Sequence, residues 1–218
     1  MFEQYSLSLA VENLLPLAFV TIGLVFLTRM LNRKNELVGE LSYVSAFLLI
    51  AGNLLNAIGK LLNALYGYHA PWMKNSLLFL AAPGFVCLAW ALRRANLKEL
   101  TAGKIWLLPI CFNGALLALT AAVKMVKGGQ AWLKLLLAVI TVASFAAFVQ
   151  LALQALRHQK QLIAGLFILS LGMSLALVFR GNDGSEAAEW AQQISNTISH
   201  ALFAFAAISL DRIEALRP

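Results

Sequence analysis

Long apolar runs separated by short polar connectors dominate this chain of 218 residues. A helix that crosses the hydrocarbon core of a bilayer needs about 20 mostly apolar residues. Reading in windows of that size finds seven such runs, at residues 11–31, 40–62, 75–92, 104–123, 131–156, 162–179 and 189–210. The pattern therefore predicts an all-α integral membrane protein, a seven-transmembrane-helix bundle, in which residues 1–218 form a single transmembrane domain.

Composition supports the membrane class that the apolar runs indicate. Hydrophobic residues make up 61% of the chain and charged residues 12%, whereas a soluble domain is typically about half apolar and about a quarter charged. An apolar excess of this size exceeds what the core of one soluble domain can bury. The runs are continuously apolar rather than alternating, which favours helices over the strands of a membrane barrel.

Positive charge is unevenly divided between the two sides of the predicted bundle. The chain carries 17 Lys and Arg residues and a formal net charge of +7. Most of these basic residues lie in the first, third and fifth connectors and the C-terminal tail, which share one side of a seven-helix bundle. Because cytoplasmic loops carry the excess of Lys and Arg, we expect the N-terminus outside and the C-terminus cytoplasmic, in a bacterial inner membrane. Lys124, Lys127 and Lys134 lie on the other side and oppose this orientation.

Polar side chains gather on narrow faces of the second and seventh runs. Such residues are costly inside a membrane, so they usually face the bundle interior and mark function. Helical geometry places the polar residues of the second run within an arc of roughly 80°, and those of the seventh within roughly 60°. Together with one acidic residue near the start of the first run, they give eight candidate ligand-binding residues: Glu12, Asn53, Asn56, Lys60, Asn63, Gln193, Asn196 and His200.

The depths of these residues predict a shared pocket. Glu12 and Lys60 both lie near the outer ends of their helices, whereas Asn53 and His200 lie close to the helix midpoints. If the first, second and seventh helices are neighbours, the polar groups form a pocket that opens outward, with a Glu12–Lys60 pair at its mouth. A structural alternative stays open, because Asn and Gln often hydrogen-bond between membrane helices and a terminal Lys can extend to the head groups.

The sequence lacks the residues that common membrane cofactors need. A retinal protein needs a lysine in its seventh helix, and residues 189–210 contain none. Intramembrane zinc hydrolases need several histidines at ligand spacing, but His69 and His158 lie in connectors on opposite sides. Haem of the b type needs paired membrane histidines, and only His200 lies within a run. We therefore expect no cofactor and no metal site, and we assign no catalytic residue.

Three interpretations of function remain. The first is a receptor-like binding or sensing module, whose outer-facing pocket accepts a small polar or amphipathic ligand such as a lipid. The second is a small-solute or proton-coupled transporter, in which polar groups would continue to the cytoplasmic side through residues such as Ser42, Ser45, Gln150 and Gln154. The third is an intramembrane lipid-modifying enzyme that uses Glu12 or His200 as a general base.

The expected partners follow from the same features. They are membrane lipids, an unidentified small ligand, and either another membrane protein or a second copy of the chain. A protein partner is expected because the seven runs leave no segment for a soluble output domain. A nucleic-acid partner is not expected, since the basic residues form no single patch with interleaved aromatic residues.

Overall fold

The computed structural model describes residues 6–95, 97, 101–179 and 186–216. These residues form helices and no strands, which confirms the all-α prediction for the described part of the chain. In order, the helices are α1 (Leu7–Glu12), α2 (Leu14–Lys34), α3 (Glu36–Tyr66), α4 (Pro71–Arg94), α5 (Ala102–Lys127), α6 (Ala131–Arg157), α7 (Gln161–Phe179) and α8 (Glu186–Ala215). Each of the seven predicted runs lies within the corresponding helix, with α1 and α2 together forming the first.

Five of these segments are long and apolar enough to cross a membrane, which supports a multi-pass membrane protein. They are α1 with α2, then α3, α4, α5 and α6. The apolar part of α7 is shorter, at Gln161–Leu177, and the long helix α8 carries the polar residues of the seventh predicted run. The full count of seven spans and the orientation of the chain stay predictions.

Proline explains why the first predicted run is divided. Pro16 has no N–H to bond the carbonyl of the residue four positions earlier, and its ring crowds that carbonyl. That residue is Glu12, where α1 ends, and Asn13 forms the turn before α2 begins. Pro109 does not divide α5, but it likewise leaves the carbonyl of Ile105 without its helical partner, and this carbonyl accepts a hydrogen bond of 3.0 Å from Trp90 Nε1 instead.

Local signals set the bounds of α3, the helix that carries the first polar stripe. The side chain of Asn35 accepts hydrogen bonds from the backbone N–H groups of Leu37 and Val38, and so caps the start of the helix. Gly67 ends it in the left-handed region, at φ 65°, where glycine is favoured because it lacks a Cβ atom. Between these caps the helix runs for 31 residues, long enough to cross a bilayer with turns to spare.

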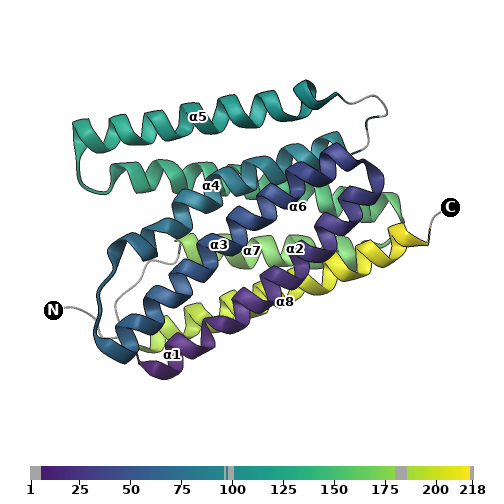
Figure 1. The fold of residues 1–218 in the computed structure, drawn as a ribbon. Helices are drawn as coiled ribbons and strands as arrows, with labels where there is room; N and C mark the ends of the chain where they lie inside the picture. Colours follow the sequence, from purple (N-terminus) through teal and green to yellow (C-terminus); the bar gives the residue numbers. More distant parts are fainter. Residues whose placement is uncertain (1–5, 96, 98–100, 180–185, 217–218) are drawn as a thin grey trace.

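Helices α2, α3, α4, α6, α7 and α8 form a closed ring, and α5 lies outside it (Figure 1). Around the ring, α2 packs on α3, α3 on α4, α4 on α6, α6 on α7, α7 on α8, and α8 returns to α2. Helix α5 packs only lightly, mainly on α4 and α6. Its apolar span is 22% buried, whereas the other four spans are 39–44% buried.

Close backbone approach between α3 and α4 tightens one side of the ring. A Cβ atom added at Gly59 would lie 2.9 Å from Met73 Cβ, and one added at Gly84 would lie 2.9 Å from Leu49 Cγ. Both distances are shorter than real Cβ contacts, so this pair of helices requires glycine at these positions. Ser45 Oγ also donates a hydrogen bond of 2.8 Å to the carbonyl of Gly84, which joins the two helices inside the membrane.

Candidate functional site

A cavity of about 430 Å³ lies at the centre of the ring, and all six ring helices contribute side chains to its wall. We call it the ring cavity. Along α2 the wall runs from Asn13 to Leu24, along α3 from Lys60 to Leu49, and along α8 from Gln192 to Phe203. At 1.5 Å per residue each of these stretches is about 16 Å long, so the cavity extends roughly halfway through the bundle.

One end of the ring cavity, which we call the pocket end, is defined by Asn13, Lys60 and Gln192. Gln192 is exposed and lines the cavity, so the cavity reaches the surface here. Asn13 Oδ1 accepts two hydrogen bonds, from Lys60 Nζ at 3.1 Å and from Gln193 Nε2 at 2.7 Å. The polar faces of α3 and α8 are therefore linked through Asn13 at the start of α2.

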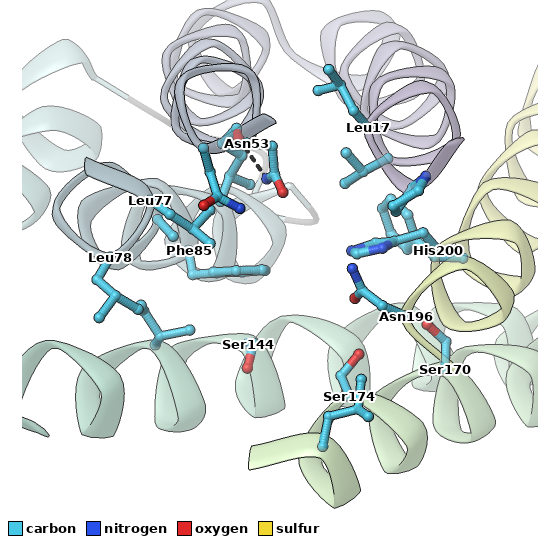
Figure 2. Close-up of a pocket in the computed structure, with 18 of the residues that line it drawn as sticks. Leu17, Asn53, Leu77, Leu78, Phe85, Ser144, Ser170, Ser174, Asn196 and His200 are labelled. Atoms are coloured by element: carbon cyan, nitrogen blue, oxygen red, sulfur yellow. Dashed lines mark hydrogen bonds between the residues drawn. The ribbon is translucent and has the colours of Figure 1, made fainter. Parts of the chain in front are cut away.

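The middle of the ring cavity presents amide, imidazole and hydroxyl groups from different helices (Figure 2). Asn53 extends from α3 on one side, with its Nδ2 donating to the carbonyl of Leu49 at 2.8 Å. Asn196 and His200 extend from α8 on the other side. His200 Nδ1 is buried and makes no hydrogen bond of good geometry within the described residues. Ser144 points into the cavity from α6.

Three serines join α7 to α8 along the wall. Ser170 Oγ donates to the carbonyl of Ser199, and Ser199 Oγ donates to the carbonyl of Ser170, both at 2.8 Å. Ser174 Oγ lies 2.8 Å from Ser199 Oγ. Because hydrogen bonds between helices replace the missing hydrophobic driving force inside a membrane, this exchange fixes the wall formed by α7.

The deep end of the ring cavity is apolar and closed. Leu24, Leu88 and Phe203 line it and are 1%, 1% and 4% exposed. Phe203 also contacts the rings of Phe148 and Phe167, with ring centroids 5.4 and 6.3 Å apart. The Phe203 ring packs directly on α2 at Gly23. The contact is so close that a Cβ atom added at Gly23 would lie only 2.5 Å from Phe203 Cε1.

Six of the eight predicted residues line the ring cavity, and two lie beside it. The six lining residues are Asn53, Asn56, Lys60, Gln193, Asn196 and His200. Glu12 Oε1 instead accepts a hydrogen bond of 2.5 Å from Thr197 Oγ1. Asn63 Nδ2 lies 3.2 Å from His69 Nδ1 near the end of α3. The wall also includes α4, α6 and α7, which the prediction of a pocket between three helices did not include.

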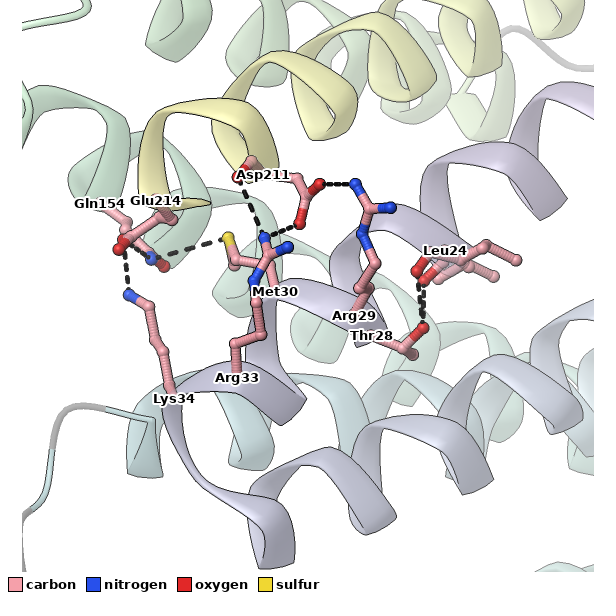
Figure 3. A network of polar contacts seen from close by, with 10 residues as sticks. Leu24, Thr28, Arg29, Met30, Arg33, Lys34, Gln154, Asp211 and Glu214 are labelled. Carbon is pink, nitrogen blue, oxygen red and sulfur yellow. Dashed lines mark hydrogen bonds and ion pairs between the residues drawn. The ribbon is translucent and has the colours of Figure 1, made fainter. Parts of the chain in front are cut away.

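A second polar cluster, not identified from the sequence, lies at the opposite end of the bundle (Figure 3). We call this end, defined by Arg29, Arg33 and Lys34 of α2 with Asp211 and Glu214 of α8, the basic end. The Asp211 side chain is fully buried and forms ion pairs with both arginines. Lys34 Nζ lies 2.6 Å from Glu214 Oε1. Asp211 and Glu214 are three residues apart, a spacing that places both on one face of a helix. This spacing, together with the basic residues Arg33 and Lys34 of the first connector, was the signal in the sequence for the cluster.

The Glu214 carboxylate collects three hydrogen bonds at the basic end, beyond the span predicted at residues 189–210. Burial alone would raise its pKa. Hydrogen bonds from Lys34 at 2.6 Å, Gln154 at 2.7 Å and His158 at 2.8 Å favour the ionised form instead. Their combined effect lowers the pKa of Glu214 to about 2. The carboxylate is therefore ionised at neutral pH and joins α8 to both α2 and α6.

The polar side chains that line the ring cavity are mainly hydrogen-bonding amides and hydroxyls. No group of three or more His, Cys, Asp or Glu side chains that could hold a metal ion occurs within the described residues. Comparison with protein-family models, with curated proteins and with solved structures finds no match to this chain. The interpretation of function therefore depends on the geometry of the cavity.

Proposed function

We propose that this protein is a membrane-embedded binding module that holds a small amphipathic ligand in the ring cavity. The observation that carries the proposal is the polarity gradient along the cavity. Lys60 and several amide groups surround the pocket end, while leucine and phenylalanine side chains close the deep end. A ligand with one polar and one apolar end matches this gradient in a single orientation.

The dimensions of the cavity also suit a ligand. Small-molecule sites are typically concave, about 300–1,000 Å³ in volume, and lined mainly by apolar side chains with a few convergent polar groups. The ring cavity has about 430 Å³ and such a lining. Asn13, Lys60 and Gln193 bond to one another, as in a network that serves helix packing. Asn53 and His200 instead face each other across the cavity (Figure 2), which leaves space between them for a ligand.

The deep end favours binding over transport. A transport path would need polar groups between the ring cavity and the basic end. The four residues suggested for such a path lie outside the cavity wall and bond elsewhere: Ser42 to Gly39, Ser45 to Gly84, Gln150 to Ala89 and Ala146, and Gln154 to Glu214. Between the ring cavity and the basic end, the side chains of Phe148, Phe167 and Phe203 instead form an aromatic cluster.

We further propose that the pocket end faces outward and that the basic end is cytoplasmic. The positive-inside tendency supports this orientation, because Arg29, Arg33 and Lys34 cluster at the basic end. Transmission of the binding event would then need a second membrane protein or a second copy of the chain. A reporter that is active only in the cytoplasm, fused to the C-terminus, tests this orientation.

Filling the cavity tests the binding function. Ser144 points into the ring cavity (Figure 2), so Ser144→Phe would occupy the space of a ligand. Ala118→Phe is the matched control, because Ala118 is exposed on α5, outside the ring. The three proteins are purified in native lipid and analysed by native mass spectrometry. We expect a bound amphiphile on wild type and Ala118→Phe that is lost from Ser144→Phe; equal occupancy of all three proteins would contradict the proposal.

A further inference from the structure

His200 presents an imidazole ring to the middle of the ring cavity. Its Nδ1 is buried without a hydrogen bond of good geometry, and no other side chain of the described residues forms a hydrogen bond with the ring. The backbone carbonyl of Asn196, one turn earlier in α8, lies close enough to interact with the imidazole. The contacts of the ring within the described part of the chain are therefore with an acceptor rather than a donor.

One of the two imidazole nitrogens needs a hydrogen-bond donor. A neutral imidazole has one N–H donor and one bare nitrogen acceptor, and a histidine is mainly neutral above pH 7. The Asn196 carbonyl can receive only the N–H group, since a carbonyl oxygen has no proton to donate. The bare nitrogen of His200 is left for a donor that the described side chains do not supply.

The opposite wall of the cavity carries an amide that is only partly bonded. Asn53 extends from α3 towards His200 (Figure 2), and its Nδ2 donates one hydrogen bond to the carbonyl of Leu49. An amide nitrogen has a second N–H group, and this group forms no hydrogen bond with another described side chain. A small polar group between the two walls can accept from Asn53 and donate to His200.

The middle of the cavity favours an uncharged group. The labelled polar side chains that reach it are amides, hydroxyls and an imidazole: Asn53, Ser144, Ser174, Asn196 and His200. Lys60 lies seven residues further along α3, about 10 Å at 1.5 Å per residue, and its Nζ donates to Asn13 Oδ1 at the pocket end. An ion held beside His200 would lose its hydration without gaining a counter-charge there, which is costly.

We infer that the ligand is a neutral amphiphile with a hydroxyl group, which donates to His200 and accepts from Asn53 in the middle of the ring cavity. This inference rests on the proposed binding function and names its ligand class. An alcohol fits because a single oxygen atom both donates and accepts. A ketone or an ester only accepts, and would leave the bare nitrogen of His200 without a partner.

The apolar part of such an alcohol has room beside the polar group. Leu77, Leu78 and Phe85 of α4 line the cavity across from α8 (Figure 2), and the closed deep end continues this apolar surface. At the ~30 Å³ that a water molecule occupies in the liquid, a cavity of about 430 Å³ holds roughly 14 non-hydrogen atoms. A medium-chain alcohol fits this space.

Four probes with an eight-carbon skeleton test the inference: 1-octanol, 2-octanone, octanoate and octylammonium. The full chain is placed in nanodiscs of phosphatidylcholine at pH 8, and the shift of its melting temperature is followed against probe concentration. Ser144→Phe in identical nanodiscs corrects for partition of the probes into lipid. We expect octanol to act at the lowest concentration. 2-Octanone should need about three- to tenfold more, the loss expected for one neutral hydrogen bond, and the two ions should be weaker still.

Variants of the two walls separate donation from acceptance. His200→Phe keeps a ring but removes the acceptor nitrogen, so it should weaken octanol binding about three- to tenfold and leave 2-octanone unchanged. His200→Gln keeps an acceptor and should bind octanol within about threefold of wild type. Asn53→Leu removes the donor on the opposite wall and should weaken octanol and 2-octanone alike. Each shift is measured from the variant's own melting temperature without probe, so that a change in stability is not mistaken for a change in affinity.

The natural ligand gives an independent test. The amphiphile that co-purifies with wild type in native lipid is released and treated with acetic anhydride. A hydroxyl oxygen forms an ester under these conditions while acetate leaves, so the mass of the ligand should rise by one acetyl group. A ligand whose mass does not change carries no hydroxyl and contradicts the inference.

The outcomes distinguish the ligand class from the binding function. Equal shifts by octanol and 2-octanone, or an equal loss of both in His200→Phe, would overturn the hydroxyl ligand and leave the binding module in place. A stronger shift by either ion would do the same. If no probe shifts wild type more than it shifts Ser144→Phe, and native lipid yields no bound amphiphile either, both proposals are wrong.

Discussion

The pocket end and the basic end place similar polar side chains inside the same bundle, yet they use them differently. At the basic end, the Asp211 and Glu214 carboxylates are satisfied by side chains from α2 and α6. From the pocket end to the middle of the ring cavity, Lys60, several amides and His200 line open space. The comparison teaches that a polar face on a membrane helix can have either of two surroundings: at the basic end the polar groups bond to one another, whereas Asn53 and His200 face open space, and only the second arrangement leaves room for a ligand.

The largest effect should follow from removal of both arginine partners of Asp211. The double variant Arg29→Met/Arg33→Met leaves a carboxylate that is fully buried without a counter-charge. The two arginines are 54% and 39% exposed, but the carboxylate they pair with is not, and a buried charge left without its partners is strongly destabilising. We expect a strongly lowered melting temperature in detergent, or loss of a monodisperse protein.

The control for this variant is Arg93→Met/Arg157→Met, which removes two exposed arginines. Exposed substitutions usually change stability by no more than about 0.5 kcal/mol. A similar loss in both double variants would mean that total positive charge, rather than the pairing of Asp211, stabilises the basic end.

The second prediction concerns the pH dependence of the basic end. The folded state lowers the pKa of Glu214 from 4.5 to about 2, so the ionised carboxylate stabilises the fold at any pH above about 4.5. This contribution is lost progressively as the pH falls from about 4.5 towards 2. Glu214→Gln should lower stability at pH 7 by about 1.5–3 kcal/mol, the range for hydrogen bonds to charged groups. Melting temperatures at pH 7, 4 and 3 should converge for the two proteins; a constant difference would show that Glu214 does not titrate in this range.

The third prediction concerns the boundary between the two ends. Gly23→Ala introduces a Cβ atom 2.5 Å from Phe203 Cε1 and 3.1 Å from Ala204 Cα, so the phenylalanine ring must shift towards the ring cavity. Overpacking of this kind typically costs about 1–3 kcal/mol, and we expect the lower part of that range because the cavity offers room. Ligand capacity should fall with stability, as native mass spectrometry would show. Unchanged stability and occupancy would mean that Phe203 does not close the deep end as described.

The polar faces could be predicted from the sequence because helical periodicity determines them. Asn53, Asn56 and Lys60 share a face of any straight helix, and a polar face in a membrane helix turns inward. Glu12 and Asn63, which the same reasoning grouped with them, lie beside the cavity wall rather than in it. Whether a side chain lines a cavity or bonds to a neighbour such as Thr197 or His69 depends on rotamers and local packing that periodicity does not contain.

The ring and the basic end could not be predicted for two further reasons. All the apolar helices have similar composition, so nothing in the pattern distinguishes α5, outside the ring, from α4 or α6 within it. Asp211 and Glu214 lie at the end of the last helix, where acidic residues are commonly solvated. Their burial depends on the pairing of α8 with α2, which brings together residues about 180 positions apart in the sequence.

The smallest change in stability is expected for Asn53, in the middle of the ring cavity, and this residue tests the comparison most directly. Asn53 donates to the carbonyl of Leu49 on its own helix and otherwise faces the ring cavity (Figure 2). Asn53→Leu therefore removes no bond between helices, and the leucine side chain finds space in the cavity. We expect a melting temperature equal to that of wild type or slightly higher, within about 0.5 kcal/mol, together with weaker binding of the amphiphile in native mass spectrometry. A large loss of stability would instead place Asn53 in the same class as Asp211, and the polar groups around the cavity would then serve the fold rather than a ligand.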